Sequence, residues 1–192
     1  MIYKGKTVVL KDGRVATLRS PKVEDAEGLL RFLQICAVET EFILRNADEC
    51  GLTLETEKQF ILNAVSSPEI MMITAFIDGE VVGNCQFSFK NLEKVKHRAG
   101  IAIGTLKKCW GSGLGAELMT ALCEEAKNCG IEQMELEYID GNIRAEKFYK
   151  KMGFTEFARR PDAVRIGGVS HSDVWMLRSC LLYTSPSPRD TE

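Results

Sequence analysis

A loop with three glycines in five residues constrains the fold of this chain more than any other segment. The loop, WGSGLG at residues 110–115, follows a run of small and β-branched residues at 97–105 that reads as a buried strand. Beyond the loop, apolar residues recur at helical spacing: Leu114, Leu118, Leu122, Ala126 and Cys129. Gly130 is placed to end that helix. The sequence therefore predicts a strand, a tight loop and an amphipathic helix over residues 113–128.

Such a loop is suited to holding a phosphate, because glycine lets the backbone approach an anion and amides at a helix start point towards it. A nucleoside-triphosphate loop is excluded, since Gly115 is followed by Ala116 and Glu117 instead of Lys and Ser or Thr. The dinucleotide-binding fingerprint fits better, with Gly111, Gly113 and Ala116 at its glycine positions and Glu135 about twenty residues later. A polar insert at 107–110 and the little α/β sequence that follows count against it. A glycine-rich turn without a ligand remains an alternative.

The remaining pattern predicts a single domain. Asp-Gly dipeptides at 12–13 and 78–79 indicate two hairpins, with strands at 7–10, 14–18, 71–77 and 80–89. Helices are expected at 23–37, 53–65 and 142–152, and further strands at 133–139, 154–158 and 174–177. We expect one domain over residues 1–180. The sequence LLYTSPSPRDTE at 181–192 changes character abruptly, and we expect a disordered or artefactual tail there.

Composition excludes several classes of protein. A net charge of -2 and a pI near 5.9 give no reason to expect nucleic-acid binding. The chain has no apolar run of the roughly 18 residues that a membrane helix needs, and its first residues lack the apolar stretch of a signal peptide. Seven cysteines without a Cys-x-x-Cys pair are typical of reduced thiols in a cytoplasmic protein. The two histidines, His97 and His171, lack the spacing of a metal site, so no metal is expected.

A second motif follows about thirty residues after the glycine loop, in the sequence NIRAEKFYKKMGF at 142–154. It fits the pattern Asn-x-x-Ala-x-x-Phe/Leu-Tyr-x-x-x-Gly-Phe at Asn142, Ala145, Phe148, Tyr149, Gly153 and Phe154. The loop fits the pattern Gln/Arg-x-x-Gly-x-Gly/Ala at Gly113 and Gly115, with Trp110 at the usual Gln/Arg position. With both motifs in this order, residues 8–177 closely resemble the GNAT superfamily of N-acetyltransferases, in the branch that includes ribosomal-protein and aminoglycoside acetyltransferases.

This resemblance implies an α/β (α+β) domain with a mixed, mostly antiparallel sheet of about seven strands and flanking helices. The fourth and fifth core strands, at 97–105 and 133–139, would splay apart to admit the coenzyme. The implied activity is acetyl transfer from acetyl-CoA to a primary amine by direct attack in a ternary complex. The sequence suggests no cysteine–histidine dyad, so a covalent acetyl-enzyme is not expected. A homodimer is possible.

The resemblance also implies a coenzyme site. The pyrophosphate would be held by the backbone amides of Trp110, Gly111, Ser112, Gly113, Leu114, Gly115 and Ala116. Backbone groups of Ile103, Gly104 and Thr105 would pair with the pantetheine like an added strand, and an amide there can face the thioester oxygen. Asn142 would lie near the pantetheine arm. Lys147 is one of several basic residues around the two motifs that would attract the anionic coenzyme.

Candidate catalytic residues follow from the same chemistry. Tyr149 is expected to act as general acid and protonate the departing thiolate, although it shares an apolar helical face and could merely pack. Glu137, on the strand beside the splay, is the candidate general base acting through water. Glu39 and Glu41 are candidates for binding the acceptor. Each of these acids could instead be an ordinary solvated side chain.

The acceptor is constrained only by charge. Residues 37–59 are rich in acids, which favours a cationic small molecule such as a polyamine or an aminoglycoside. A protein N-terminus of the ribosomal-protein type is the alternative, and an ordinary charged surface explains the stretch equally well. A non-catalytic CoA-binding module and an NAD-dependent oxidoreductase are alternatives of another class, and the presence of Tyr149 favours an enzyme.

Overall fold

The computed structural model describes residues 1–45 and 53–180. Within them the α-helices and the strands follow one another in the order β1 (Lys6–Val9), β2 (Val15–Arg19), α1 (Ala26–Glu39), α2 (Leu54–Ser66), β3 (Ile70–Ile77), β4 (Glu80–Phe89), β5 (Arg98–Thr105), α3 (Leu114–Asn128), β6 (Gln133–Ile139), α4 (Ile143–Lys151), β7 (Thr155–Ile166) and β8 (Val169–Ser179). Two short 3-10 helices, η1 (Val23–Asp25) and η2 (Lys107–Cys109), precede α1 and the glycine loop.

The strands form one eight-stranded sheet in the order β1-β2-β3-β4-β5-β6-β8-β7. Every neighbouring pair is antiparallel except β5 and β6, which run parallel. The predicted mixed, mostly antiparallel sheet is confirmed, with eight strands where about seven were expected. Sequential strands that are neighbours in the sheet need only short connections, whereas the parallel β5–β6 pair requires the crossover helix α3.

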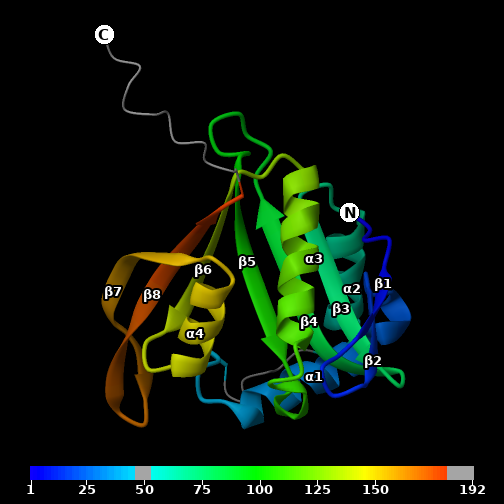
Figure 1. Ribbon diagram of the computed structural model, residues 1–192, viewed down its shortest axis with the longest axis horizontal. Coiled ribbons are helices and arrows are strands. Elements are labelled where there is room, and N and C mark those ends of the chain that lie inside the picture. The colour runs from blue at the N-terminus through cyan, green and yellow to red at the C-terminus, as the bar shows by residue number, and fades with distance from the viewer. Residues whose placement is uncertain (46–52, 181–192) are drawn as a thin grey trace.

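The parallel pair is also where the sheet opens. β5 and β6 are paired only at Arg98–Gln133, Ala99–Met134 and Gly100–Glu135. The two strands meet near the top of Figure 1 and separate towards the bottom, where β5 leads into η2 and β6 leads into α4. The predicted splay is therefore confirmed, and the stretch of β5 beyond Gly100 pairs with β4 on one side only.

Helices cover both faces of this sheet. In Figure 1, α3 and α4 lie in front of the sheet and α2 lies behind it, with α1 near the lower end. The apolar stripe of α3 accounts for its position, because Leu114, Leu118 and Leu122 are completely buried. On β4, beneath this helix, Gly83 leaves room for the Leu118 side chain, because a Cβ at this position would lie 3.0 Å from it. Close packing of α3 on β4 thus anchors the helix that the glycine loop begins.

The last two strands differ from the prediction. Residues 154–158 and 174–177 were expected to be short strands, but β7 and β8 are a long hairpin joined by Gly167 and Gly168, both with positive φ. β7 lies at the edge of the sheet and is mostly exposed, so its polar sequence shows no alternation of apolar residues. Pro161 and two irregularities in the pairing obscure the strand pattern further. The Gly-Gly turn was the signal that could have revealed the hairpin.

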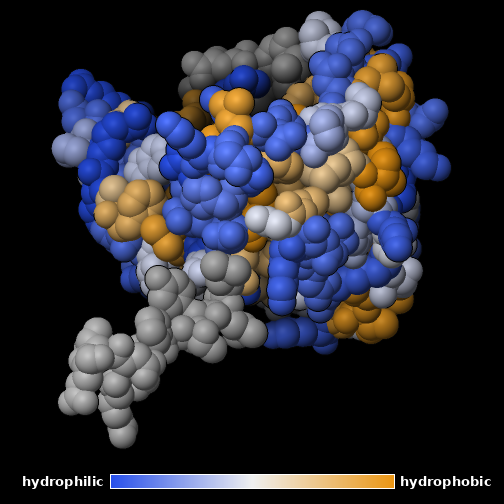
Figure 2. Space-filling model, turned by 90° about the horizontal axis from the view of Figure 1, so that it is seen from above, coloured by the Kyte–Doolittle hydropathy of each residue, from blue (hydrophilic) through white to orange (hydrophobic). Residues whose placement is uncertain are grey.

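Hydrophilic side chains dominate the face seen in Figure 2, and the hydrophobic ones lie in separate groups. No helix among residues 1–45 and 53–180 is long and apolar enough to cross a membrane.

Candidate active site

A cavity of about 760 Å³ occupies the space between the diverging parts of β5 and β6. Its walls come from both halves of the molecule. The glycine loop, the start of α3 and β5 form one side, and β6, α4 and β8 form the other. The end of α1 and residues 40 and 42–44 also line the cavity. The splay in the sheet thus produces a cavity, and both sequence motifs line it.

The glycine loop turns sharply before α3. Gly111 and Gly113 have φ values of 77° and 94°, which other residues rarely adopt. Gly113 is the N-cap of α3, and the first helical hydrogen bond runs from the Glu117 amide to the Gly113 carbonyl at 3.1 Å. The loop therefore needs glycine for its backbone conformation, and it leaves the first amides of the helix without helical partners.

Some amides of this loop are used within the protein. The Trp110 amide donates to the Lys107 carbonyl at 3.0 Å and the Ser112 amide to the Cys109 carbonyl at 3.4 Å. The Leu114 amide donates to the Ser112 hydroxyl at 3.4 Å. Ser112 and Leu114 are buried and do not line the cavity.

Other amides of the loop are free. Gly111, Gly113, Gly115 and Ala116 line the cavity, and their amides make no hydrogen bond to any described residue. The expected anion site thus narrows from seven consecutive residues to these four. Four unpaired amides at the positive end of a 15-residue helix suit a diphosphate.

The open edge of β5 continues from this anion site. Ile103, Gly104 and Thr105 line the cavity beyond the last paired residue, Gly100. One carbonyl is occupied, because the Trp110 indole donates to the Thr105 carbonyl at 3.1 Å. The remaining strand edge can accept an extended, amide-containing chain. Free amides next to an unpaired strand edge fit the pyrophosphate and pantetheine of a coenzyme A molecule.

The opposite wall begins at α4. Asn142 lines the cavity, and its side chain caps α4 by accepting a hydrogen bond from the Ala145 amide at 3.1 Å. Arg144 stacks on the Trp110 ring, with its guanidinium carbon 3.8 Å from the ring centre, so a contact bridges the two walls. Burial lowers the pKa of Arg144. Lys147 is exposed and lies outside the cavity lining, whereas Lys151, one turn later, is part of it.

Tyr149 lies deeper on the same helix. Its ring packs against Phe148, Tyr138 and Phe154, with centroids 5.4 to 6.1 Å apart, and the residue also lines the cavity. Its hydroxyl makes no hydrogen bond to any described residue. Burial raises the pKa of Tyr149 to about 12, so the side chain keeps its proton at neutral pH. Tyr149 therefore both packs and presents a protonated group to the cavity.

Carboxylates are distributed unevenly around the cavity. Glu137 is exposed and lines it, as does Glu39, whose carboxylate accepts a hydrogen bond from the Lys107 amide at 2.6 Å. Glu41 is exposed and does not line the cavity. Asp173 on β8 lines it and is only 5% exposed, and it is paired with the largely exposed Arg160 of β7.

The predicted acidic wall is largely apolar where the structure describes it. Phe42, Ile43 and Leu44 line the cavity, and Leu44 is 69% exposed. The predicted acids Asp48 and Glu49 lie outside the described residues. An apolar segment and the carboxylates of Glu137 and Asp173 thus line the same cavity.

Sequence reasoning did not single out several residues of this cavity, among them Lys11, Tyr138 and Asp173. Lys11 is in a hairpin turn about a hundred residues before the glycine loop, and Asp173 is in a strand without a motif. No local pattern distinguishes these side chains from surface residues. Tyr138 could have been found, because it neighbours Glu137 on the strand that was expected to splay.

Comparison with known proteins agrees with this geometry. Residues 37–154, more than half of the chain, match a sequence model of the acetyltransferase (GNAT) family. A GNAT-family acetyltransferase from Streptococcus pneumoniae superimposes with a TM-score of 0.80 and 25% identity, over 85% of this chain and 99% of that chain.

Two further solved structures share the fold. A putative acetyltransferase from Salmonella typhimurium, solved with its cofactor acetyl-CoA, has a TM-score of 0.76 and 17% identity, over 90% of this chain and 98% of that chain. The ribosomal-protein-alanine N-acetyltransferase from Brucella melitensis has a TM-score of 0.73 and 20% identity, over 84% of this chain and 98% of that chain.

The topology of the sheet excludes the alternative of a dinucleotide-binding fold. Its fingerprint belongs to a doubly wound parallel sheet, whereas the strands here are antiparallel except for one pair. The sequence match, the splayed sheet and the glycine loop agree, and the chain belongs to the GNAT family of acetyltransferases, as an acetyl-CoA-dependent N-acetyltransferase.

Proposed function

We propose that this enzyme transfers an acetyl group from acetyl-CoA to a primary amine by direct attack within a ternary complex. One observation carries the proposal. A single cavity contains the free amides of the glycine loop, the open edge of β5, the protonated Tyr149 and the carboxylates of Glu137 and Asp173. Donor binding and acid–base groups therefore share one space, as direct transfer requires.

The coenzyme, when bound, supplies an acetyl group activated as a thioester. The amides of Gly111, Gly113, Gly115 and Ala116 would bind its pyrophosphate, and the edge of β5 at Ile103 and Gly104 would align its pantetheine arm. A backbone amide of this edge that faces the thioester oxygen would stabilise the negative charge that develops there.

Tyr149 would protonate the sulfur of the leaving group. A general acid must hold its proton until the bond breaks, and the raised pKa of Tyr149 ensures this at neutral pH. Proton transfer from a nearby hydroxyl neutralises the charge that develops on the departing sulfur and so favours its departure. The alternative of a merely packing tyrosine is weakened because Tyr149 also lines the cavity.

The acceptor arrives as an ammonium ion and must lose a proton before it attacks. Glu137, which lines the cavity and is open to solvent, would take that proton through a water molecule. Asp173 would attract the ammonium, because a nearly buried carboxylate exerts a stronger field than an exposed one. Arg160 compensates the charge of Asp173 in the absence of the amine.

A cationic small molecule such as a polyamine or an aminoglycoside remains the proposed acceptor, in agreement with the carboxylates of the cavity. The peptide N-terminus is a second candidate, favoured by the apolar residues Phe42, Ile43 and Leu44 at the same end. An N-terminal amine brings an adjacent side chain that could contact this segment, and the fold is shared with a ribosomal-protein-alanine N-acetyltransferase.

Thiol release from acetyl-CoA tests the proposal across four sets of acceptors: polyamines, aminoglycosides, amino acids and peptides with free N-termini. Turnover with any of these amines, with loss of turnover when the amine is blocked, supports amine acetylation. Coenzyme binding without turnover in all four sets would instead support a non-catalytic CoA-binding module. Preference among the sets separates the two acceptor candidates.

A further inference from the structure

The hairpin β1–β2 is attached to the glycine loop, although about a hundred residues separate them in sequence. The Lys11 amide donates to the Ser112 carbonyl at 2.9 Å. The Arg14 guanidinium donates to the Lys108 carbonyl at 3.0 Å and is itself held by Asp12 at 2.6 Å. These bonds fix the turn of the hairpin, and Lys11 with it, beside the loop.

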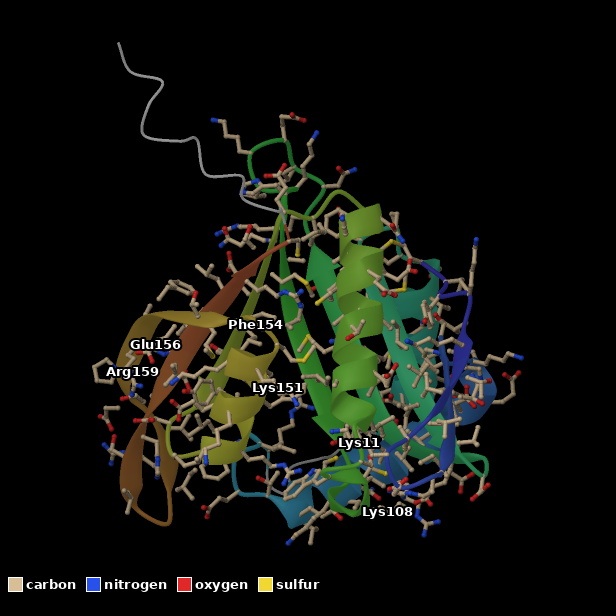
Figure 3. All side chains as sticks on the ribbon, in the orientation of Figure 1. Lys11, Lys108, Lys151, Phe154, Glu156 and Arg159 are labelled. Atoms are coloured by element: carbon tan, nitrogen blue, oxygen red, sulfur yellow. The ribbon has the colours of Figure 1, made fainter. Side chains whose placement is uncertain are left out.

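The side chain of Lys11 lies along this loop. Its methylene carbons are 3.6 to 3.8 Å from the position that a Cβ of Gly113 would occupy. Lys11 also lines the cavity, as do Gly111 and Gly113 with their free amides. Figure 3 shows Lys11 at the end of α3 where the glycine loop lies, across the gap from Lys151 on α4.

The ammonium of Lys11 has no counterion in the part of the chain that the structure describes. Its neighbour Asp12 is engaged by Arg14. Arg144, another cation of the cavity lining, is stacked on Trp110. A lysine without a carboxylate partner, held next to unpaired amides, is arranged to meet an anion from outside the chain.

We propose that Lys11 is a coenzyme-binding residue whose ammonium pairs with the pyrophosphate of acetyl-CoA. This inference rests on the proposed use of acetyl-CoA as donor. Lys11 precedes residues 37–154, the region that matches the family, so it is a contribution of this chain's N-terminal hairpin and not of the family motif. It adds a point charge to the dipoles of the free amides and strengthens coenzyme binding without entering the chemical step.

The test replaces Lys11 by Met and measures two ligands, CoA and 3′-dephospho-CoA, and two acetyl donors, acetyl-CoA and S-acetylpantetheine. The Kd for CoA and for 3′-dephospho-CoA is expected to rise about tenfold, as for the loss of one partly exposed charge-assisted hydrogen bond. The KM for acetyl-CoA should rise in parallel while kcat stays unchanged. The KM for S-acetylpantetheine, which has no phosphate, should not change. Raising the salt concentration should narrow the difference from the wild type.

A charge series separates electrostatics from packing. Lys11→Arg is expected to retain the affinity for CoA, and Lys11→Glu to weaken binding more than Lys11→Met does. Lys4→Met removes the same charge from an exposed position that does not line the cavity, and it should bind CoA as the wild type does. The backbone bond from Lys11 to Ser112 is available to every variant, and unfolding temperatures will verify that each is folded.

Three results would overturn the proposal. Wild-type affinity for CoA in Lys11→Met would exclude any role, and weakened binding of CoA but not of 3′-dephospho-CoA would move the contact to the 3′-phosphate. An equal increase in the KM for S-acetylpantetheine would indicate a structural effect. If the wild-type protein binds no CoA at all, the proposed function fails before Lys11 is tested, so the two failures are distinguishable.

Discussion

The Tyr149 ring packs in an aromatic cluster while the residue also lines the cavity, where we propose that it acts as a proton donor. Burial strengthens the proton-donor role, since it disfavours the phenolate and raises the pKa to about 12. Between neutral pH and that value, Tyr149 stays protonated, so any fall in activity in mildly alkaline solution must come from another group.

Tyr149→Phe should keep the packing and remove the proton. We expect kcat to fall by about 100-fold or more, the range for loss of a general acid, with little change in the KM for acetyl-CoA. The measurement is steady-state kinetics of thiol release between pH 7 and pH 10.

Tyr138→Phe is the comparison for this variant, because Tyr138 is the other tyrosine of the cavity and its ring is 6.1 Å from that of Tyr149. Loss of turnover in Tyr138→Phe with full turnover in Tyr149→Phe would transfer the acid role to Tyr138. Full turnover in both variants would leave the reaction without a tyrosine acid.

Glu137 and Asp173 should be separable by their kinetic effects. Glu137→Gln is expected to lower kcat by about 100-fold at neutral pH, because it removes the base. The residual rate should climb with pH, since a larger fraction of the amine is then already neutral. Asp173→Asn is expected mainly to raise the KM for the amine, about tenfold for one charged contact. If Asp173→Asn instead lowered kcat in a pH-dependent way and Glu137→Gln mainly raised the KM for the amine, Asp173 would be the base and Glu137 the residue that attracts the ammonium.

At the scale of elements, the glycine loop connects the open edge of β5 to the start of α3. Its alternation of engaged and free amides depends on the left-handed conformations of Gly111 and Gly113. The hairpin β1–β2 supports it from outside, through Lys11 and Arg14. The proposed coenzyme site therefore depends on three elements and not on the motif alone.

Gly113→Ala should destabilise this junction. A φ of 94° costs a residue with a Cβ about 1–2 kcal/mol, although the Cβ itself would meet only the Lys11 stem at ordinary distance. We expect the free energy of unfolding to fall by that amount and CoA binding to weaken.

Gly115→Ala is the matched control for stability. Gly115 is helical and has no positive φ, so an alanine there should not lower the free energy of unfolding. Urea unfolding of both variants provides the comparison, and equal destabilisation would show that the left-handed conformation of Gly113 is not what the loop needs.

At the scale of the whole molecule, the cavity lies where the two parts of the sheet separate. The strands from β1 to β5 carry α3 and the glycine loop, whereas β6, β8 and β7 carry α4. β5 and β6 pair at three residue positions where they meet, and the Arg144 guanidinium stacks on the Trp110 ring across the opening. A ligand that fills the cavity would therefore contact both parts of the sheet.

Acetyl-CoA should raise the unfolding temperature accordingly. At a hundred times its Kd a ligand adds about 2.7 kcal/mol, which for a domain of this size corresponds to about 5–10 °C. NAD at the same concentration should leave the unfolding temperature unchanged. Thermal-shift measurements with both compounds check this, and stabilisation by NAD alone would contradict the assignment of the glycine loop.

The elements around the proposed coenzyme site could be predicted from the sequence, because their signals are local. Glycines before an amphipathic helical stretch predict the loop and α3, and the motif from Asn142 to Phe154 predicts α4 with Tyr149 on it. Asp-Gly turns predicted both early hairpins. The full length of the β7–β8 hairpin was not predicted, because an exposed edge strand shows no alternation of apolar residues.

The meeting of distant side chains in the cavity could be seen only in the three-dimensional structure. Lys11 reaches the glycine loop through pairing of the β1–β2 turn with Ser112, and Asp173 reaches the cavity because β8 pairs with β6 next to the splay. It also showed that four of the seven expected amides are free, and that apolar residues replace part of the predicted acidic wall. The positions of Lys11 and Asp173 depend on hydrogen bonds between segments far apart in the chain, whereas a sequence pattern reports only the periodicity of neighbouring residues.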